Sequence, residues 1–202
     1  MSIPRYQPGE NERRSLESYL DLLYSESSRV NLTRVPREQA WTRHIEESLA
    51  LVPLRRWSAG ERVLDLGSGA GIPGIPLAIT QPAVSVGLIE RDRSKAAFLS
   101  RCVETLGLSA VGVLGQDALE LARSKGFAAA DVLVSRAAVP PQDLFRTAGR
   151  LLRTGGEGLV HVGGAVSLDA DLALAARRAG VGDLRLETSG RSRILRFRRL
   201  PG

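Results

Sequence analysis

Apolar residues recur along the first part of the chain at the spacing of a helix. Over residues 10–56 they return every three or four positions, which places their side chains on one helix face. The first run carries Leu16, Leu20 and Leu23, and the second carries Trp41, Ile45, Leu49 and Val52. We therefore predict that residues 1–56 form a helical N-terminal extension.

From residue 61 the pattern changes to short apolar runs that alternate with longer helical ones. The predicted strands cover 62–67, 84–90, 111–117, 130–137 and 157–164, and the predicted helices cover 75–80, 92–107, 141–152 and 168–179. Strands that alternate with helices form a parallel sheet covered on both faces. Residues 183–199 are typical of two strands joined by a Ser-Gly turn, which adds an antiparallel edge hairpin. We predict one compact, doubly wound α/β domain over residues 57–202.

Composition narrows the class of protein. The chain has 202 residues, of which 43% are hydrophobic and 25% charged, as in ordinary globular proteins. No apolar run approaches the roughly 20 residues that a membrane-spanning helix needs, and the first residues lack the apolar region of an export signal. The single cysteine excludes a cysteine-based zinc site, and the presence of only two histidines argues against a multi-histidine metal centre. We expect a cytoplasmic, metal-free protein that is a monomer.

The charge balance is basic and almost entirely due to arginine. Lysine and arginine total 28 against 22 acidic residues, which gives a net charge of +6. Arginine suits phosphate groups because its planar guanidinium donates two parallel hydrogen bonds. Between Arg185 and Arg199 arginines far outnumber acids. This basic tail is explained equally well by an anionic macromolecular partner and by a solvated strand in a chain rich in arginine codons.

The segment after the first predicted strand carries the most chemical information. It reads Asp65-Leu-Gly67-Ser-Gly69-Ala-Gly71-Ile-Pro-Gly74. Glycines here let the backbone turn tightly and approach a ligand, and the helix that follows adds unpaired N–H groups. The stretch from Gly69 to Gly74 fits the GxGxxG dinucleotide pattern, so the glycines alone leave NAD possible.

Two carboxylates favour S-adenosylmethionine over NAD. Asp65 precedes the glycines, where a carboxylate can hold a cationic amino group. Glu90 closes the second strand, where a carboxylate accepts hydrogen bonds from ribose hydroxyls. A ligand that joins an amino acid to a nucleoside without a pyrophosphate fits both. We predict that Asp65, Gly67, Gly69, Gly71 and Glu90 bind S-adenosylmethionine in a sheet of the class I (Rossmann-like) methyltransferase type.

These residues resemble a known family. Residues 62–79, RVLDLGSGAGIPGIPLAI, are similar to the signature of the bacterial small-subunit (16S) rRNA guanine-N7 methyltransferase G family, also called glucose-inhibited division protein B. The resemblance spans roughly residues 15–165 with its motifs in the same order. Its further segments are Asn31-Leu32-Thr33, Arg43–Ser48, LIERDRSKAAFLSRCVETLGL, VSRAAVPPQDL and RLLRTGGEG.

The resemblance implies methyl transfer from S-adenosylmethionine to N7 of a guanine in small-subunit ribosomal RNA. It implies cofactor contacts at Gly67, Ile72, Ala118, Leu119 and Arg136, with Glu90 in the ribose-binding position. One departure stands out. Relatives usually read Leu-Lys-Gly at the fifth strand, where this chain has Val162-Gly163-Gly164 and therefore lacks the lysine.

Methylation of guanine N7 does not require an acid–base side chain from the protein. The nitrogen carries a lone pair and no proton, so the reaction needs no general base, and catalysis is mostly alignment. We therefore assign no certain catalytic residue and keep Arg136 as the candidate. Cys102 fits the apolar face of a helix and is interpreted as a core residue. His161, on a strand, is interpreted as structural too.

Candidate RNA contacts come from two places. Arg43 and His44 lie on the second helical run, and we expect both off its apolar face; Arg191 and Arg193 lie in the basic tail. The expected partner is small-subunit ribosomal RNA or the ribosomal subunit. Two other functions stay open, namely a small-molecule methyltransferase of the same fold, and an RNA- or cofactor-binding protein with little or no turnover.

Overall fold

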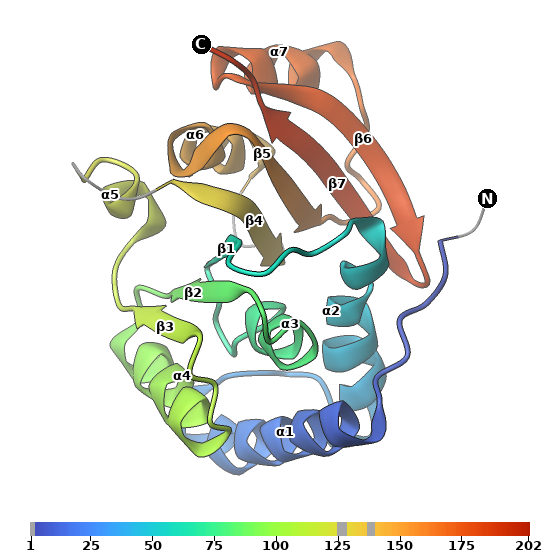
Figure 1. Cartoon of the computed structure of the whole chain (residues 1–202), viewed down its shortest axis with the longest axis vertical. Helices are drawn as coiled ribbons and strands as arrows, with labels where there is room; N and C mark the ends of the chain where they lie inside the picture. Colours follow the sequence, from blue (N-terminus) through green and yellow to red (C-terminus); the bar gives the residue numbers. More distant parts are fainter. Residues whose placement is uncertain (1–2, 125–128, 137–139) are drawn as a thin grey trace.

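A computed structural model describes residues 3–124, 129–136 and 140–202. It shows one seven-stranded sheet between two layers of helices (Figure 1). The strands are β1 (Arg62–Leu66), β2 (Ser85–Ile89), β3 (Val111–Leu114), β4 (Ala130–Arg136), β5 (Leu152–His161), β6 (Val181–Ser189) and β7 (Ser192–Arg199). The α-helices are α1 (Glu10–Val30), α2 (Glu47–Leu49), α3 (Gly74–Thr80), α4 (Arg93–Thr105), α5 (Ala118–Leu121), α6 (Pro141–Leu151) and α7 (Ala170–Arg178). Short helical turns complete the chain at η1 (Arg37–Gln39), η2 (Trp41–Glu46) and η3 (Val52–Leu54).

The strand order is β3-β2-β1-β4-β5-β7-β6. Strands β1 to β5 pair in parallel, and β7 is antiparallel to both of its neighbours, β5 and β6. This confirms the predicted doubly wound sheet with an antiparallel hairpin. From β1 the chain adds β2 and β3 on one side of the sheet, and it then adds β4 and β5 on the other side. Open α/β sheets bind ligands at such a switch point, beyond the carboxyl ends of the strands.

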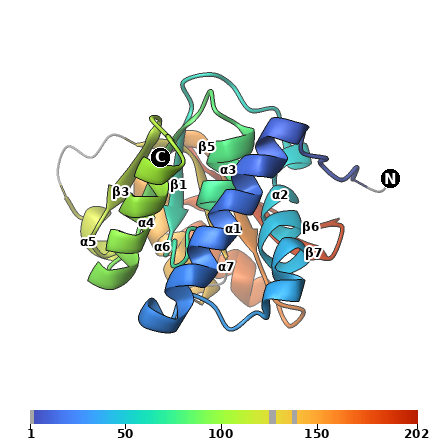
Figure 2. The same cartoon turned by 90° about the horizontal axis from the view of Figure 1, so that it is seen from below.

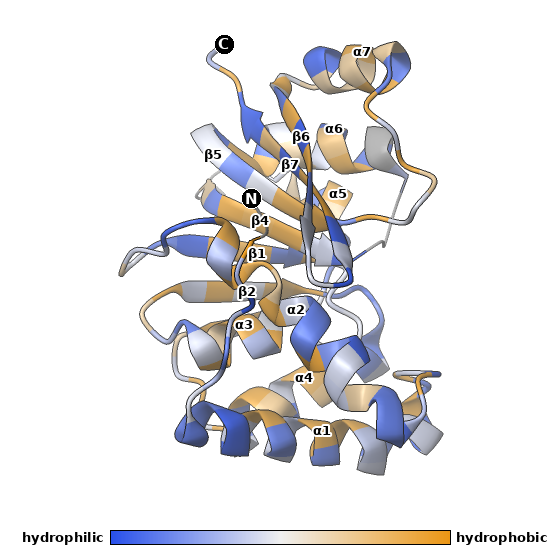
Figure 3. Cartoon of the chain, turned by 90° about the vertical axis from the view of Figure 1, so that its right-hand side faces the viewer, coloured by the Kyte–Doolittle hydropathy of each residue, from blue (hydrophilic) through white to orange (hydrophobic). Residues whose placement is uncertain are grey.

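Two apolar cores lie on opposite faces of the sheet. One joins α1, α3 and α4 to the face that carries Val63 and Val86, and the other joins α6 and α7 to the face that carries Leu64 and Phe197. Helix α1 crosses α3 and α4 (Figure 2) and turns its polar residues outward (Figure 3). The predicted N-terminal helices are present and share a core with the sheet. The division at residue 56 stays a prediction.

Within the described ranges, no helix is long and apolar enough to cross a membrane.

Candidate functional site

The glycine loop follows β1 at the carboxyl edge of the sheet. Gly67, Gly69 and Gly71 have φ of 66°, 56° and 94°, a left-handed conformation that side chains disfavour. Space is restricted as well. A Cβ on Gly71 would lie 2.5 Å from Cδ1 of Ile75, and one on Gly74 would lie 2.4 Å from Cδ2 of Leu88. The predicted tight turn is thus confirmed, and the chain's own packing restricts Gly71 and Gly74 as well; the predicted close approach to a ligand stays a prediction.

The two predicted carboxylates both hold the backbone of this loop. Asp65 Oδ2 accepts a hydrogen bond from the Gly74 N–H at 3.1 Å. Glu90 Oε2 accepts one from Gly69 at 2.8 Å, while its Oε1 accepts one from Asp92 at 2.8 Å. Carboxyl oxygens are good acceptors for backbone N–H groups, so both side chains help to fix the conformation of the loop.

Asp65 is enclosed by the protein, whereas a residue that contacts a ligand directly is accessible to it. The residue is 0% exposed, and Oδ1 has no hydrogen-bond partner within the described part of the chain. Burial raises the pKa of this carboxyl to about 7, although the Gly74 N–H acts to lower it. The predicted contact with a ligand's amino group stays a prediction, and the observed contact is with the start of α3.

The predicted adenine-side residues lie farther along the same edge. Ala118 and Leu119 begin α5, just beyond β3, and both are half-buried. The Asp117 carboxylate caps this helix by accepting a hydrogen bond from the Leu119 N–H at 2.8 Å. Ile72, in the glycine loop, is buried. All three predicted positions therefore border the sheet edge that carries the loop.

Arg136 connects this edge to the N-terminal helices. It ends β4, and its Nη1 donates a hydrogen bond to the Arg43 carbonyl at 2.7 Å. Glu47 lies between the two arginines, with its carboxylate 3.7 Å from Arg136 Nη1 and 2.9 Å from Arg43 Nη1. Ala137, which follows Arg136 in the family motif, lies outside the described residues, as do Ala138 and Val139.

An open cleft of about 460 Å³ adjoins Arg136, and we call it the arginine cleft. Its lining residues are Val35, Arg43, Glu47, Arg136, His161, Val162, Gly163, Arg191, Ser192 and Arg193. Four arginines and one glutamate give the lining a positive charge. The structure thus brings Arg43, Arg191 and Arg193, three of the four predicted RNA contacts, together with the predicted cofactor contact Arg136.

His44 does not join them, and the expectation that it lies off the apolar face is wrong. It is 1% exposed, and its Nε2 lies 2.9 Å from Thr33 Oγ1. Burial, with Arg136 nearby, lowers the pKa of His44 to about 4. Residues Trp41–Glu46 form a π-helix, which has more residues per turn than the α-helix assumed from the spacing. Ala40, His44 and Ser48, spaced four residues apart, are all buried, so the buried face of this segment includes His44.

The tail arginines divide between solvent and the fold. Arg191 is exposed and forms no side-chain hydrogen bond or ion pair with any described residue. Arg193 donates hydrogen bonds to the Gly164 and Val166 carbonyls at 2.6 and 3.0 Å, so it also braces the loop after β5. Arg196 pairs with Glu157 on β5 at 2.6 Å. The tail is therefore neither wholly solvated nor wholly available to a partner.

The two residues interpreted as structural are both buried. Cys102 is 0% exposed, and burial raises the pKa of its thiol to about 12. His161 is 7% exposed, and burial next to Arg136 lowers its pKa to about 4. Both side chains are thus uncharged at neutral pH, and His161 forms part of the wall of the arginine cleft.

Sequence reasoning missed Tyr19 and Glu47. The Tyr19 hydroxyl, in α1, donates a hydrogen bond to the Ala70 carbonyl in the glycine loop at 2.7 Å. Tyr19 falls three residues after Leu16 on the apolar face of its helix, and a buried tyrosine needs a partner for its hydroxyl. That signal was present in the sequence, although it did not identify the partner. Glu47 lies within the Arg43–Ser48 segment of the family resemblance, but the sequence analysis assigned it no role.

No group of three or more His, Cys, Asp or Glu side chains within the described ranges is arranged to hold a metal ion.

Known structures with this fold define the class of protein. The chain aligns with a mutant of MtNAS crystallised with S-adenosylmethionine, with a TM-score of 0.63 and 19% identity over 95% of this chain and 77% of that one. It aligns with the cyclase SpnF at a TM-score of 0.63 and 20% identity, over 100% of this chain and 99% of that one. The fold is the Rossmann-like fold of class I methyltransferases.

The sequence identifies the family within this class. The profile described as GidB, rRNA small subunit methyltransferase G, matches residues 12–176, and the chain belongs to this family. A ribosomal RNA small subunit methyltransferase G from Moorella thermoacetica is 35% identical over 150 residues, which are 73% of this chain and 62% of that protein. The relative from Sorangium cellulosum is 39% identical over 60% of this chain and 52% of that protein. The chain thus spans between half and two thirds of the length of these two relatives.

Proposed function

We propose that this protein transfers a methyl group from S-adenosylmethionine to N7 of a guanine in small-subunit ribosomal RNA. The observation that carries the proposal is the position of Arg136. It ends β4, the strand next to the one that feeds the glycine loop, and it also lines the arginine cleft. Arg136 therefore belongs to the basic cleft and ends the strand beside the one that leads into the proposed cofactor loop. Membership of the GidB family supports the same reaction.

The residues present fit S-adenosylmethionine. Gly67 and Gly69 leave the loop backbone accessible, and a side chain at either position would be strained by its positive φ. Gly71 and Ile72 complete the cradle. Glu90 is 8% exposed and retains lone pairs for ribose hydroxyls, while the residues proposed for the adenine side and the reacting centre are Ala118, Leu119 and Arg136. S-adenosylmethionine supplies a methyl group on a positively charged sulfur, which is already activated for transfer.

The chain's own residues have to align the guanine rather than deprotonate it. Its N7 lone pair is free at neutral pH, so positioning provides most of the catalysis. Arg43, Arg136 and Arg191 face the cleft where RNA phosphates would be held, and guanidinium groups bind phosphate in a defined orientation. Asp65 and Glu90 hold the loop, and the buried Asp65 acts on the cofactor through that loop. We further propose a cytoplasmic monomer that uses no metal.

The test measures transfer of a labelled methyl group from S-adenosylmethionine. The acceptors are deproteinised small-subunit ribosomal RNA, intact small subunits and a metabolite extract. We expect label in RNA or subunits, and sequencing should map it to N7 of a guanine. Label only in the extract would contradict the RNA substrate. Cofactor binding without label in any acceptor would show a binding protein instead.

A further inference from the structure

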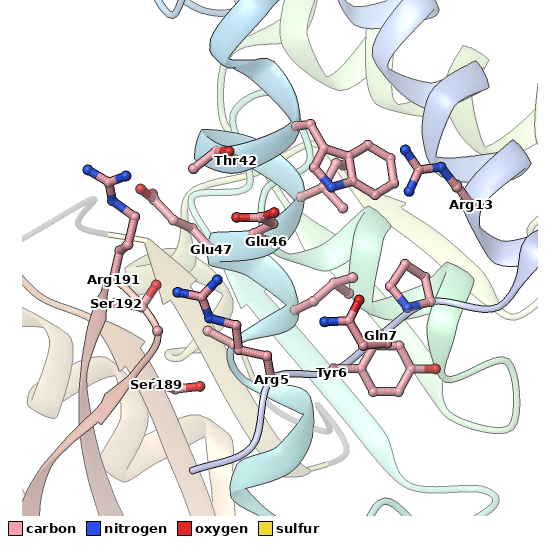
Figure 4. Close-up of a pocket in the computed structure, with 16 residues that line it drawn as sticks. Arg5, Tyr6, Gln7, Arg13, Thr42, Glu46, Glu47, Ser189, Arg191 and Ser192 are labelled. Carbon is pink, nitrogen blue, oxygen red and sulfur yellow. The ribbon is translucent and has the colours of Figure 1, made fainter. Parts of the chain in front are cut away.

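A second cleft, which we call the N-terminal cleft, adjoins the arginine cleft (Figure 4). It encloses about 100 Å³ between the segment that precedes α1, the helix that carries Trp41 and Glu47, and the turn between β6 and β7. Glu47, Arg191 and Ser192 line both clefts, so the two lie side by side. Arg191 stands at their junction.

The N-terminal cleft adds positive charge beyond that junction. Arg5 is exposed, and like Arg191 it forms no side-chain hydrogen bond or ion pair with any described residue. Figure 4 shows the Arg5 and Arg191 side chains on the same side of the cleft as Glu46 and Glu47. Glu47 is already paired with Arg43, which leaves Glu46 as the acid that opposes these two arginines.

Aromatic surface lies beside this charge. Trp41 and Tyr6 line the cleft and are both half-buried. The Arg13 guanidinium stands 4.5 Å from the centre of the Trp41 ring, and Arg13 is also paired with Glu17. The Ser189 hydroxyl, in the wall, is buried and has no partner among the described residues. Unpaired arginines beside aromatic rings are typical of surfaces that bind single-stranded nucleic acid.

We propose that the N-terminal cleft binds the single-stranded RNA that flanks the methylated guanine. One strand would then run from the arginine cleft, past Arg191, to Arg5. Its phosphates contact the two unpaired guanidinium groups, and one of its bases lies near Trp41. This inference rests on the proposed function, because it needs an RNA strand whose reactive guanine lies beside Arg136. It assigns RNA binding to Arg5, which lies near the N-terminus and is not part of the basic tail.

The variant that tests the proposal is Arg5→Ala, because Arg5 lines only the N-terminal cleft. Affinity for deproteinised small-subunit ribosomal RNA is measured by fluorescence anisotropy at several salt concentrations. We expect the Kd for RNA to rise by no more than about tenfold, because Arg5→Ala removes one charge-assisted contact. The salt slope should fall by about 0.7, the value for one phosphate of a single strand. The matched control is Arg178→Ala on α7, outside both clefts, and it should leave affinity and slope unchanged.

Trp41 supplies a second readout. The chain has two tryptophans, so Trp57→Phe leaves Trp41 as the only one. We expect single-stranded RNA oligonucleotides to change the emission of Trp41 only once they are long enough to extend beyond the arginine cleft. Arg5→Ala should reduce that change at a fixed subsaturating RNA concentration.

The outcomes separate this inference from the proposed function. If the wild-type protein methylates RNA, but Arg5→Ala binds it with unchanged affinity and salt slope, the N-terminal cleft is not part of the RNA track. If Arg5→Ala weakens binding to intact subunits and not to deproteinised RNA, the cleft binds a protein and the inference is overturned. Failure of the wild type to methylate any RNA would instead contradict the proposed function.

Discussion

The hydroxyl of Tyr19 lies 2.7 Å from the carbonyl oxygen of Ala70, and this hydrogen bond ties the first long helix to the glycine loop. Tyr19 is 0% exposed, and burial raises the pKa of its hydroxyl well above the ordinary value, so it stays a donor. Ala70 stands between Gly69 and Gly71, two positions of the loop with positive φ. The N-terminal helix therefore helps to fix the shape of the proposed cofactor site.

Tyr19→Phe keeps the buried ring and removes this donor. We expect a loss of stability of about 1–3 kcal/mol, because the Ala70 carbonyl is left buried without a partner. Affinity for S-adenosylmethionine should fall as well, because the loop becomes less well ordered before binding. Chemical denaturation and calorimetric titration measure the two effects.

Tyr24→Phe is the matched control. The Tyr24 hydroxyl also donates to a backbone carbonyl, that of Val35 at 2.7 Å, but this bond lies away from the glycine loop. It should lower stability without changing affinity for S-adenosylmethionine. Equal effects of the two variants on that affinity would contradict a specific role for Tyr19.

Asp65→Asn should change how stability depends on pH. The pKa of Asp65 is about 7 in the folded chain because of burial, against an ordinary value of 3.8. Between these values the folded state binds more protons than the unfolded state, so this group's stabilising contribution is lost as pH rises toward 7. Asparagine does not ionise, so Asp65→Asn does not lose stability in this way as pH rises. Its stability relative to the wild type should therefore increase from about pH 4 to about pH 7 and then level off, with a slope of at most about 1.4 kcal/mol per pH unit.

Asp131→Asn provides the comparison for this pH dependence. Burial acts to raise the pKa of Asp131, but hydrogen bonds from the Arg62 N–H and the Arg153 side chain outweigh it, and the pKa lies below 3.8. From about pH 5 upward Asp131 is thus almost fully ionised in both states, and its variant should differ from the wild type by a nearly constant amount. A constant difference for Asp65→Asn as well would show that its pKa is not raised.

Arg136→Ala should lower the rate of methyl transfer even when RNA is saturating. The side chain faces the arginine cleft and holds the Arg43 carbonyl, so its loss disturbs alignment at the proposed reacting centre. Misalignment of this kind costs on the order of 10- to 100-fold in rate. Single-turnover kinetics measure it. Arg153→Ala removes an ion-paired arginine from the opposite edge of the sheet and should leave the rate unchanged. Equal rates for wild type and Arg136→Ala would exclude the proposed role.

Gly163→Lys should strengthen RNA binding. A Cβ at Gly163 would meet no atom within 4 Å, and the position lines the arginine cleft at the point where the family resemblance implies a lysine. One added phosphate contact should steepen the salt slope by about 0.7. Gly163→Gln, which is similar in length and uncharged, should leave the slope unchanged. If both variants behave alike, the missing lysine has no electrostatic role at this position.

The local parts of the site could be predicted from the sequence. The turn at Gly67 to Gly74 follows from backbone sterics, which depend on a few neighbouring residues, and the strand at 62–66 follows from a short apolar run. The burial of Cys102 followed from helical spacing in the same way. Such features need no knowledge of the rest of the fold.

The contacts between distant elements could not be predicted. Tyr19 meets Ala70 across 51 positions, and Arg196 meets Glu157 across 39. His44 is buried on a face that it shares with Ala40 and Ser48, and the spacing of Trp41, Ile45 and Leu49 did not predict that face. Each of these depends on how elements pack, so the tail arginines looked equivalent in the sequence although their partners differ.

The position of β7 has a consequence for synthesis on the ribosome. This strand follows β6 in the chain but lies between β5 and β6 in the sheet. A nascent chain that ends before residue 192 therefore leaves one edge of β5 unpaired and gives β6 no neighbour. Exposed strand edges are sites of aggregation, and proteins are synthesised from the N-terminus. The sheet can be completed only after β7 leaves the exit tunnel, so the edge of β5 stays exposed until then.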